Sequence, residues 1–331
     1  MSSKPSTLSF VTTFKCTAQC ENCCYQCSPK CERIMSFDEM VFYLNSCLKQ
    51  YHSSLKVLVL TGGEAFLLGE DLDKIVKYAT EKGLITRIVS NAYWATSYEN
   101  AYKRLLKLKE NGLKEINYST GDEHQKWVPF TKIKNATKAA VDLELICAIN
   151  VETHDGSSFI FETEAKKDET FYQCIEKGCV NIEHGAWISM EKENSYENGF
   201  VFSSQMPCTS ILDVITINPY GEVLACCGLR SEQNPYLRLG NIRENSIKSM
   251  YESSTHDVIK MWLHVEGPNK ILDFVNNKKG SPKRNYKCHI CASCSELFKD
   301  SSNIEILKRF KSEYTPSIYL KYLLTTKKEQ V

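Results

Sequence analysis

The sequence predicts an α/β fold, a partial (β/α)6 TIM barrel followed by a small C-terminal domain, on two observations. Six short apolar runs predict strands, at residues 7–14, 56–60, 85–89, 115–119, 143–149 and 180–184. Between them, segments with helix-period apolar positions predict helices, at residues 37–50, 71–82, 97–110, 131–141 and 168–177. Because strand and helix alternate, we expect the strands to pair in parallel.

The first predicted helix has a candidate N-cap at Ser36. Glu39 follows Ser36 at the spacing of a reciprocal capping box. This start places residues 16–31 in the loop after the first strand. Functional groups of a β/α barrel lie on the loops after strand C-termini, so that loop and residues 62–64, after the second strand, are expected to face the same end.

A polar stretch at residues 189–205 predicts a boundary or a mobile loop. It divides the chain into a barrel, residues 1–188, and a C-terminal domain with its linker, residues 189–331. In the second part we expect a hairpin with a turn at residues 218–221, two short helices and an exposed loop, at residues 213–226, 247–253, 256–264 and 267–287.

Size and charge argue against several classes of protein. The 331 residues suffice for two domains. The 41 basic and 40 acidic side chains leave a formal charge of +1, which gives no broad attraction to nucleic acid or to an anionic membrane. No signal peptide or membrane-spanning run is apparent, so we expect a cytoplasmic protein. Sixteen closely spaced cysteines in such a chain favour metal ligation over disulfides.

Three cysteines near the start of the chain carry the strongest chemical signal. Cys16, Cys20 and Cys23 are followed about forty positions later by the segment Thr61-Gly-Gly-Glu. Three thiolates hold only three irons of a cubane cluster, which leaves the fourth iron open to a small chelating ligand. The alternative is a closed zinc knuckle. Its fourth ligand would come from the neighbouring thiols of Cys24, Cys27 or Cys31.

This spacing is similar to the signature of the radical S-adenosylmethionine (SAM) superfamily. The resemblance implies a [4Fe-4S] cluster on Cys16, Cys20 and Cys23, with SAM chelating the open iron. An electron from the cluster would then cleave SAM, and the 5'-deoxyadenosyl radical would abstract a substrate hydrogen. The family usually has an aromatic residue before the third cysteine, where this chain has Asn22.

Several strand-end residues are candidates for binding SAM. Glycines let backbone approach a ligand closely, and the resemblance places the segment Gly62, Gly63 and Glu64 at the SAM methionyl group. Polar residues that end the third and fourth strands are further candidates, namely Ser90, Asn91 and Ser119. His124 and His184 also fall on this rim, although a lone rim histidine is more often structural.

A second cysteine group lies near the end of the chain. Its spacing resembles a shortened SPASM domain, often called Twitch, which implies one auxiliary [4Fe-4S] cluster on Cys208, Cys226 and two of Cys288, Cys291 and Cys294. Structural zinc is the alternative for this group too. The remaining cysteines Cys47, Cys147, Cys174 and Cys179 are predicted to be small buried hydrophobes.

The cysteine pair 23–24 followed by Ser28-Pro29 resembles the opening of radical SAM peptide epimerases and of related enzymes that tailor ribosomally made peptides. For an epimerase, Cys227 is the candidate hydrogen donor, because an S–H bond is comparatively weak. The expected partners are a peptide and an electron donor such as flavodoxin or ferredoxin. The runner-up is a maturase that forms a thioether or carbon–carbon crosslink. The alternative of another class is a non-catalytic zinc or iron–sulfur binding protein.

Overall fold

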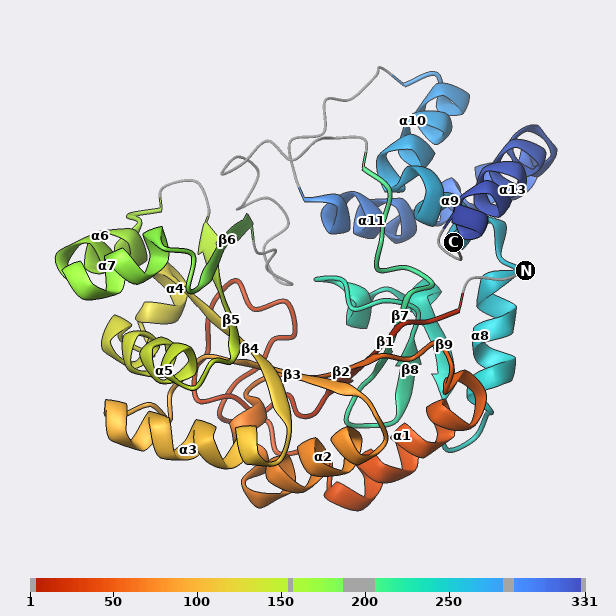
Figure 1. Cartoon of the computed structure of the whole chain (residues 1–331). Coiled ribbons are helices and arrows are strands. Elements are labelled where there is room, and N and C mark those ends of the chain that lie inside the picture. The colour runs from red at the N-terminus through yellow and green to blue at the C-terminus, as the bar shows by residue number, and fades with distance from the viewer. Residues whose placement is uncertain (1–3, 154–156, 187–205, 282–288, 329–331) are drawn as a thin grey trace.

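The computed structural model describes residues 4–153, 157–186, 206–281 and 289–328. In these ranges one nine-stranded sheet runs in the order β6-β5-β4-β3-β2-β1-β7-β8-β9 (Figure 1). Strands β1 to β6 pair in parallel and confirm the predicted partial (β/α)6 barrel. Their bounds are Thr7–Val11, Val57–Thr61, Ile85–Ser90, Leu113–Gly121, Ile146–Thr153 and Asn181–Ala186.

Helices that connect these strands cover one side of the sheet, along the lower and left edges in Figure 1. They bury apolar residues at helix spacing against the strands, as Met40, Tyr43 and Leu44 do in α1. None of the helices in the described ranges is both long and apolar enough to cross a bilayer. The bounds are Phe37–Tyr51 for α1, Glu70–Glu81 for α2, Tyr98–Glu110 for α3, Asp122–Gln125 for α4, Phe130–Asp142 for α5, Ile160–Lys167 for α6 and Glu169–Glu176 for α7, with a short 3-10 helix at Ala65–Leu68.

The predicted capping box at the start of α1 is confirmed. The Glu39 N–H donates to Ser36 Oγ at 3.3 Å, and the Ser36 N–H donates to Glu39 Oε2 at 3.0 Å. Glu39 also forms ion pairs with Arg33 and Arg243. The cap therefore connects the helix both to the end of the first cysteine loop and to the C-terminal half of the chain.

The predicted hairpin is confirmed, and it continues the barrel sheet. Strand β7 (Val214–Ile217) pairs in parallel with β1, and β8 (Glu222–Leu224) and β9 (Arg238–Asn241) follow in antiparallel order. Ile215 and Ile217 of β7 belong to the barrel core. The sheet and the barrel core thus extend past residue 188, and the division of the chain at that point stays a proposal.

Helices at the end of the chain enclose a second hydrophobic core, which contains Trp262, Leu272 and Tyr314. Figure 1 shows α9 to α13 grouped beyond the β7 side of the sheet. The bounds are Ile247–Thr255 for α8, Val258–Glu266 for α9, Pro268–Lys279 for α10, Ile290–Lys299 for α11, Ser301–Arg309 for α12 and Lys311–Lys328 for α13, with two 3-10 helices at Ser231–Gln233 and Pro235–Leu237.

The prediction of an exposed loop at residues 267–287 is wrong for its first half. Helix α10 begins there at Pro268, a favourable first helical residue, and buries Ile271, Leu272 and Val275. Most of the Lys and Asn residues of this stretch are exposed or half-buried in the helix, and Asn269 is buried. Residues 282–287 and the polar stretch 189–205 lie outside the described ranges. Elements α4, α6, β9 and α11 to α13 were not predicted from the sequence.

Candidate active site

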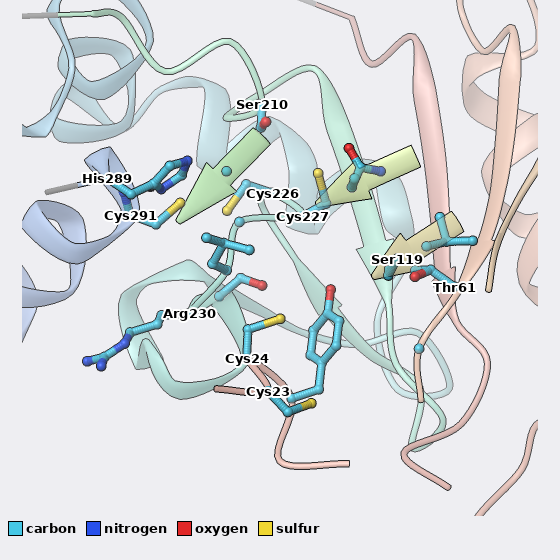
Figure 2. Close-up of a pocket in the computed structure, with 18 of the residues that line it drawn as sticks. Cys23, Cys24, Thr61, Ser119, Ser210, Cys226, Cys227, Arg230, His289 and Cys291 are labelled. Atoms are coloured by element: carbon cyan, nitrogen blue, oxygen red, sulfur yellow. Dashed lines mark hydrogen bonds between the residues drawn. The ribbon is translucent and has the colours of Figure 1, made fainter. Parts of the chain in front are cut away.

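A cavity of about 670 Å³ opens at the C-terminal ends of the parallel strands. Strand ends line it with polar side chains and glycines, from Thr61, Gly62, Gly63, Ser90, Asn91, Ser119, Asn150, Glu183, His184 and Gly185. Figure 2 shows Cys23 and Cys24 of the first cysteine loop on one side of this cavity and Cys226, Cys227 and Cys291 on the other. The two cysteine groups, about 200 positions apart in the sequence, therefore share one cavity.

Gly62 and Gly63 let the end of β2 touch the backbone that leads into the first cysteine loop. Gly62 has a φ of +130°, and a Cβ there would lie 2.4 Å from the Thr13 oxygen. A Cβ at Gly63 would lie 2.1 Å from the Lys15 oxygen. The Gly63 N–H donates to the Thr13 oxygen at 2.7 Å. Any side chain at these two positions would therefore push the cysteine loop away from the strand ends.

Two sulfurs of the first cysteine group already accept hydrogen bonds. The N–H of Ala18 and the amide of Asn91 donate to Cys16 Sγ at 3.4 and 3.5 Å. The backbone N–H of Cys27 donates to Cys23 Sγ at 3.3 Å. The adjacent Cys27 thiol is the main cause that lowers the pKa of Cys23 to about 6, while burial raises the pKa of Cys16 to about 12. Hydrogen bonds of this kind stabilise thiolates that bind iron.

The residues present fit a [4Fe-4S] cluster with an open iron and SAM. Cys16, Cys20 and Cys23 all face the cavity that the glycine pair also lines. Burial raises the pKa of Cys20, so iron must displace the thiol proton, as in any thiolate site. The same cavity is lined by Ser90, Asn91 and Ser119, whose polar side chains can form hydrogen bonds with the nucleotide. The individual assignments of these residues stay predictions.

The resemblance places Glu64 at the SAM methionyl group, but the cavity is not lined by Glu64 in the described residues. Glu64 is fully buried, and its carboxylate accepts hydrogen bonds from the N–H groups of Phe66 and Asn91 and from Ser90 Oγ, at 3.0, 2.8 and 2.8 Å. Burial raises its pKa to about 7. Ser90 and Asn91 line the cavity, whereas Glu64 is not among the described residues that do. Its side chain orders the end of β3, and only its neighbouring backbone is close to the cavity.

The extra thiols of the first loop lie in two different environments. Cys24 and Cys27 are both buried and line the cavity, and Figure 2 shows Cys24 there. Cys27 also lies beside Cys23. Cys31 is only partly buried, and its sulfur lies 3.6 Å from Ser28 Oγ. Cys24 and Cys27 are thus the additional thiols close to the first group.

The second cysteine group approaches the cavity from three segments. Cys208 is held against the end of α9, where its N–H donates to the Leu263 oxygen at 2.9 Å. Cys226 follows β8 and is 5% exposed. Cys291 and Cys294 lie three residues apart in the first turns of α11, a spacing that places both on one face of the helix. Cys288, the third candidate in this stretch, lies outside the described residues.

His289 orders this helix start, because its Nδ1 accepts the Cys291 N–H at 3.2 Å. Figure 2 shows His289 and Cys291 side by side. In the described ranges, no three His, Cys, Asp or Glu side chains converge closely enough to hold a single metal ion. The donor set of Cys208, Cys226, Cys291 and Cys294 is four thiols, the ligand set of a fully coordinated iron–sulfur cluster.

Cys227 lines the same cavity as Cys23, next to the candidate ligand Cys226. Burial raises the pKa of its thiol, and a hydrogen bond with Ser210 opposes this effect. Ser210 also lines the cavity, and Figure 2 shows both residues on its upper side. The Cys227 thiol therefore lines the same cavity as the first cysteine group, and burial favours its protonated form.

The rim contains polar residues that sequence reasoning weighed lightly or missed. His124 lines the cavity, and burial lowers its pKa to about 4, so the imidazole is neutral at physiological pH. His184 Nε2 lies 2.6 Å from Glu162 Oε1 on α6, which orients the ring. Asn150 was missed, although its place near the end of a predicted strand is the signal that identified Ser119.

The prediction for the remaining cysteines is half correct. Cys47 and Cys147 are buried, but Cys174 is partly exposed and Cys179 is exposed. Cys179 lies between α7 and β6, in neither element. None of these four lines the cavity of the described residues.

Comparison with known proteins adds three findings. The model of the SPASM family, an iron–sulfur cluster-binding domain, matches residues 208–295. The putative peptide biosynthesis protein YydG of Bacillus subtilis (strain 168) is 21% identical over 326 residues, covering 93% of this chain and 97% of that protein. Two solved structures are 16% identical with TM-scores of 0.49. The match to BtrN in complex with AdoMet and 2-DOIA covers 82% of this chain and 91% of the BtrN chain. The match to anSMEcpe with bound AdoMet covers 92% of this chain and 99% of the anSMEcpe chain.

The SPASM match covers all five candidate ligands, Cys208, Cys226, Cys288, Cys291 and Cys294, and agrees with the expected auxiliary cluster. This combination of motif and domain uses SAM, a [4Fe-4S] cluster and an auxiliary iron–sulfur cluster as cofactors. With its N-terminal cysteine motif on a partial parallel barrel, the chain resembles the radical SAM enzymes that carry a C-terminal SPASM domain.

Proposed function

We propose that this chain tailors a ribosomally made peptide by radical SAM chemistry, and that it epimerises a residue at its Cα. The observation that carries the proposal is the position of Cys227, which lines the same cavity as the first cysteine group. The name of the relative YydG, a putative peptide biosynthesis protein, supports a peptide substrate. The SPASM match supports an auxiliary cluster beside this thiol.

The cofactors supply the radical that abstracts the Cα hydrogen of the substrate. The chain then has to deliver a hydrogen atom to the opposite face of the planar carbon. The Cys227 S–H does so in the proposal, and its sulfur is left as a thiyl radical. One electron and one proton restore the thiol, and an auxiliary cluster held by Cys226 and its partner cysteines would supply the electron. Substrate and product have equal mass.

Cys227→Ala tests the donor. Anaerobically reconstituted enzyme is incubated with SAM, dithionite and a short peptide encoded beside its gene, in deuterated water. We expect the wild type to release 5'-deoxyadenosine and to form a D-residue that carries one solvent deuterium. Cys227→Ala should still release 5'-deoxyadenosine but form no such residue. Cys179→Ala is the matched control, because this exposed thiol lies outside the cavity.

Three results would contradict the proposal in different ways. A D-residue with solvent deuterium formed by Cys227→Ala at the wild-type rate would remove Cys227 from the mechanism. A product two daltons lighter than the peptide would replace epimerisation by crosslinking, since a crosslink removes two hydrogen atoms. An unchanged electron paramagnetic resonance (EPR) signal when SAM is added to wild-type enzyme would overturn the radical reaction itself.

A further inference from the structure

Asn22, between two candidate cluster ligands, connects the first cysteine loop to the far side of the barrel. It is completely buried, and its Nδ2 donates to Glu152 Oε2 at 2.9 Å. Glu152 lies near the end of β5 and is 1% exposed. A buried side-chain hydrogen bond thus joins the loop of Cys20 and Cys23 to a strand 130 residues later.

The second oxygen of the same carboxylate binds the backbone at the start of α4, directly after β4. Glu152 Oε1 accepts the Glu123 N–H at 2.5 Å, at the start of α4. The approach depends on Gly121, where a Cβ would lie 2.4 Å from Glu152 Cγ. Glu152 therefore connects the cysteine loop, the end of β4 and the end of β5 through a single carboxylate.

The charge of this carboxylate also acts on the cluster site. Two N–H donors stabilise its ionised form. Asn22, which donates to this carboxylate, lies two residues after Cys20 and directly before Cys23, so the carboxylate is buried beside the segment that carries two candidate ligands. Glu123 is paired with Lys126 at 2.5 Å. A buried negative charge beside the cluster loop disfavours the addition of an electron to the cluster.

We propose that Glu152 is a positioning residue for the first iron–sulfur cluster. Through Asn22 it holds the cysteine loop where Cys20 and Cys23 bind iron, and its charge lowers the reduction potential of that cluster. The inference rests on the assignment of Cys16, Cys20 and Cys23 as ligands and does not depend on the substrate.

The test is a reductive titration of the reconstituted holoenzyme followed by EPR. The signal that changes when SAM is added reports the first cluster, which separates it from the auxiliary one. Glu152→Gln removes the charge with little change in shape, and we expect the midpoint potential of the SAM-responsive signal to rise. Asp122→Asn is the matched control. This carboxylate is 9% exposed, sits beside Glu123 in α4, and accepts the backbone N–H groups of Ser158 and Ile160.

Length-exchange variants separate positioning from charge. Glu152→Asp shortens the connection to Asn22, and we expect less iron in the first cluster and a weaker response of its EPR signal to SAM. The double variant Asn22→Gln with Glu152→Asp restores the combined length and should recover both. Equal potentials for Glu152→Gln, Asp122→Asn and wild type would overturn the charge effect. No loss in Glu152→Asp, or no recovery in the double variant, would overturn the positioning role. If wild type shows no SAM-responsive signal, the ligand assignment fails instead.

Discussion

At the scale of single residues, the site depends on positions where no side chain fits. Gly62→Ala adds a methyl group 2.4 Å from the Thr13 oxygen, so the first cysteine loop has to move. We expect 5'-deoxyadenosine release to fall by about 100-fold, the cost of a displacement of about 1 Å in a positioned site. Gly83→Ala is the control. It also has a positive φ, but its Cβ meets nothing within 4 Å, so it adds the backbone strain without the collision. Equal losses in the two variants would contradict this explanation.

Glu64 gives a prediction on pH. Burial raises its pKa from 4.5 to about 7, so between these values the folded chain binds more protons than the unfolded chain. The contribution of Glu64 to the free energy of unfolding therefore decreases as the pH rises through this window and is constant above it. The decrease is on the order of 3 kcal/mol. Chemical unfolding at pH 5 and pH 8 should show it in wild type and not in Glu64→Gln. The same pH dependence in both proteins would show that another group titrates.

At the scale of elements, the start of α1 has two roles that mutations can separate. Ser36→Ala removes one cap hydrogen bond and should lower the free energy of unfolding by about 1 kcal/mol. Ser97→Ala removes the equivalent cap of α3 and should cost a similar amount. Glu39→Gln should cost more than either, because Glu39 also pairs with Arg33 and Arg243. Thermal and urea unfolding of the three variants measure the order. A cost of Glu39→Gln no larger than that of Ser97→Ala would mean that these ion pairs contribute nothing.

At the scale of the whole molecule, the barrel and the C-terminal part share one sheet. A fragment of residues 1–206 would lose the pairing of β1 with β7 and seven buried core side chains, those of Ile215, Ile217, Val223, Ile242, Ile247, Met250 and Tyr251. Their burial is worth roughly 10–20 kcal/mol, as much as the whole stability of a typical domain or more. We expect the fragment to show no cooperative unfolding transition by circular dichroism, whereas the full chain does. A cooperative transition in the fragment would establish residues 1–188 as an independent domain.

Local patterns were enough to predict much of this molecule. The six parallel strands and the first helices follow from apolar periodicity, and the capping box follows from the spacing of Ser36 and Glu39. The same reasoning was wrong for α10, because half of its residues are Lys or Asn and this composition was weighed above the apolar positions Ile271, Leu272 and Val275. The last three helices were not predicted; their buried apolar residues pack with α9 and α10 in the second core.

The sequence by itself determined the chemistry of this protein, because cysteine spacing and glycine content are local properties. Cys16, Cys20 and Cys23 carry the radical SAM resemblance without any fold. Only the tertiary structure decided which distant residues share the cavity. It placed Cys227 in the same cavity as the first cysteine group. It also buried the Glu64 side chain in a hydrogen bond with Ser90 and connected Asn22 to Glu152 by another. These relations depend on parallel pairing of strands far apart in the chain, which no local pattern encodes.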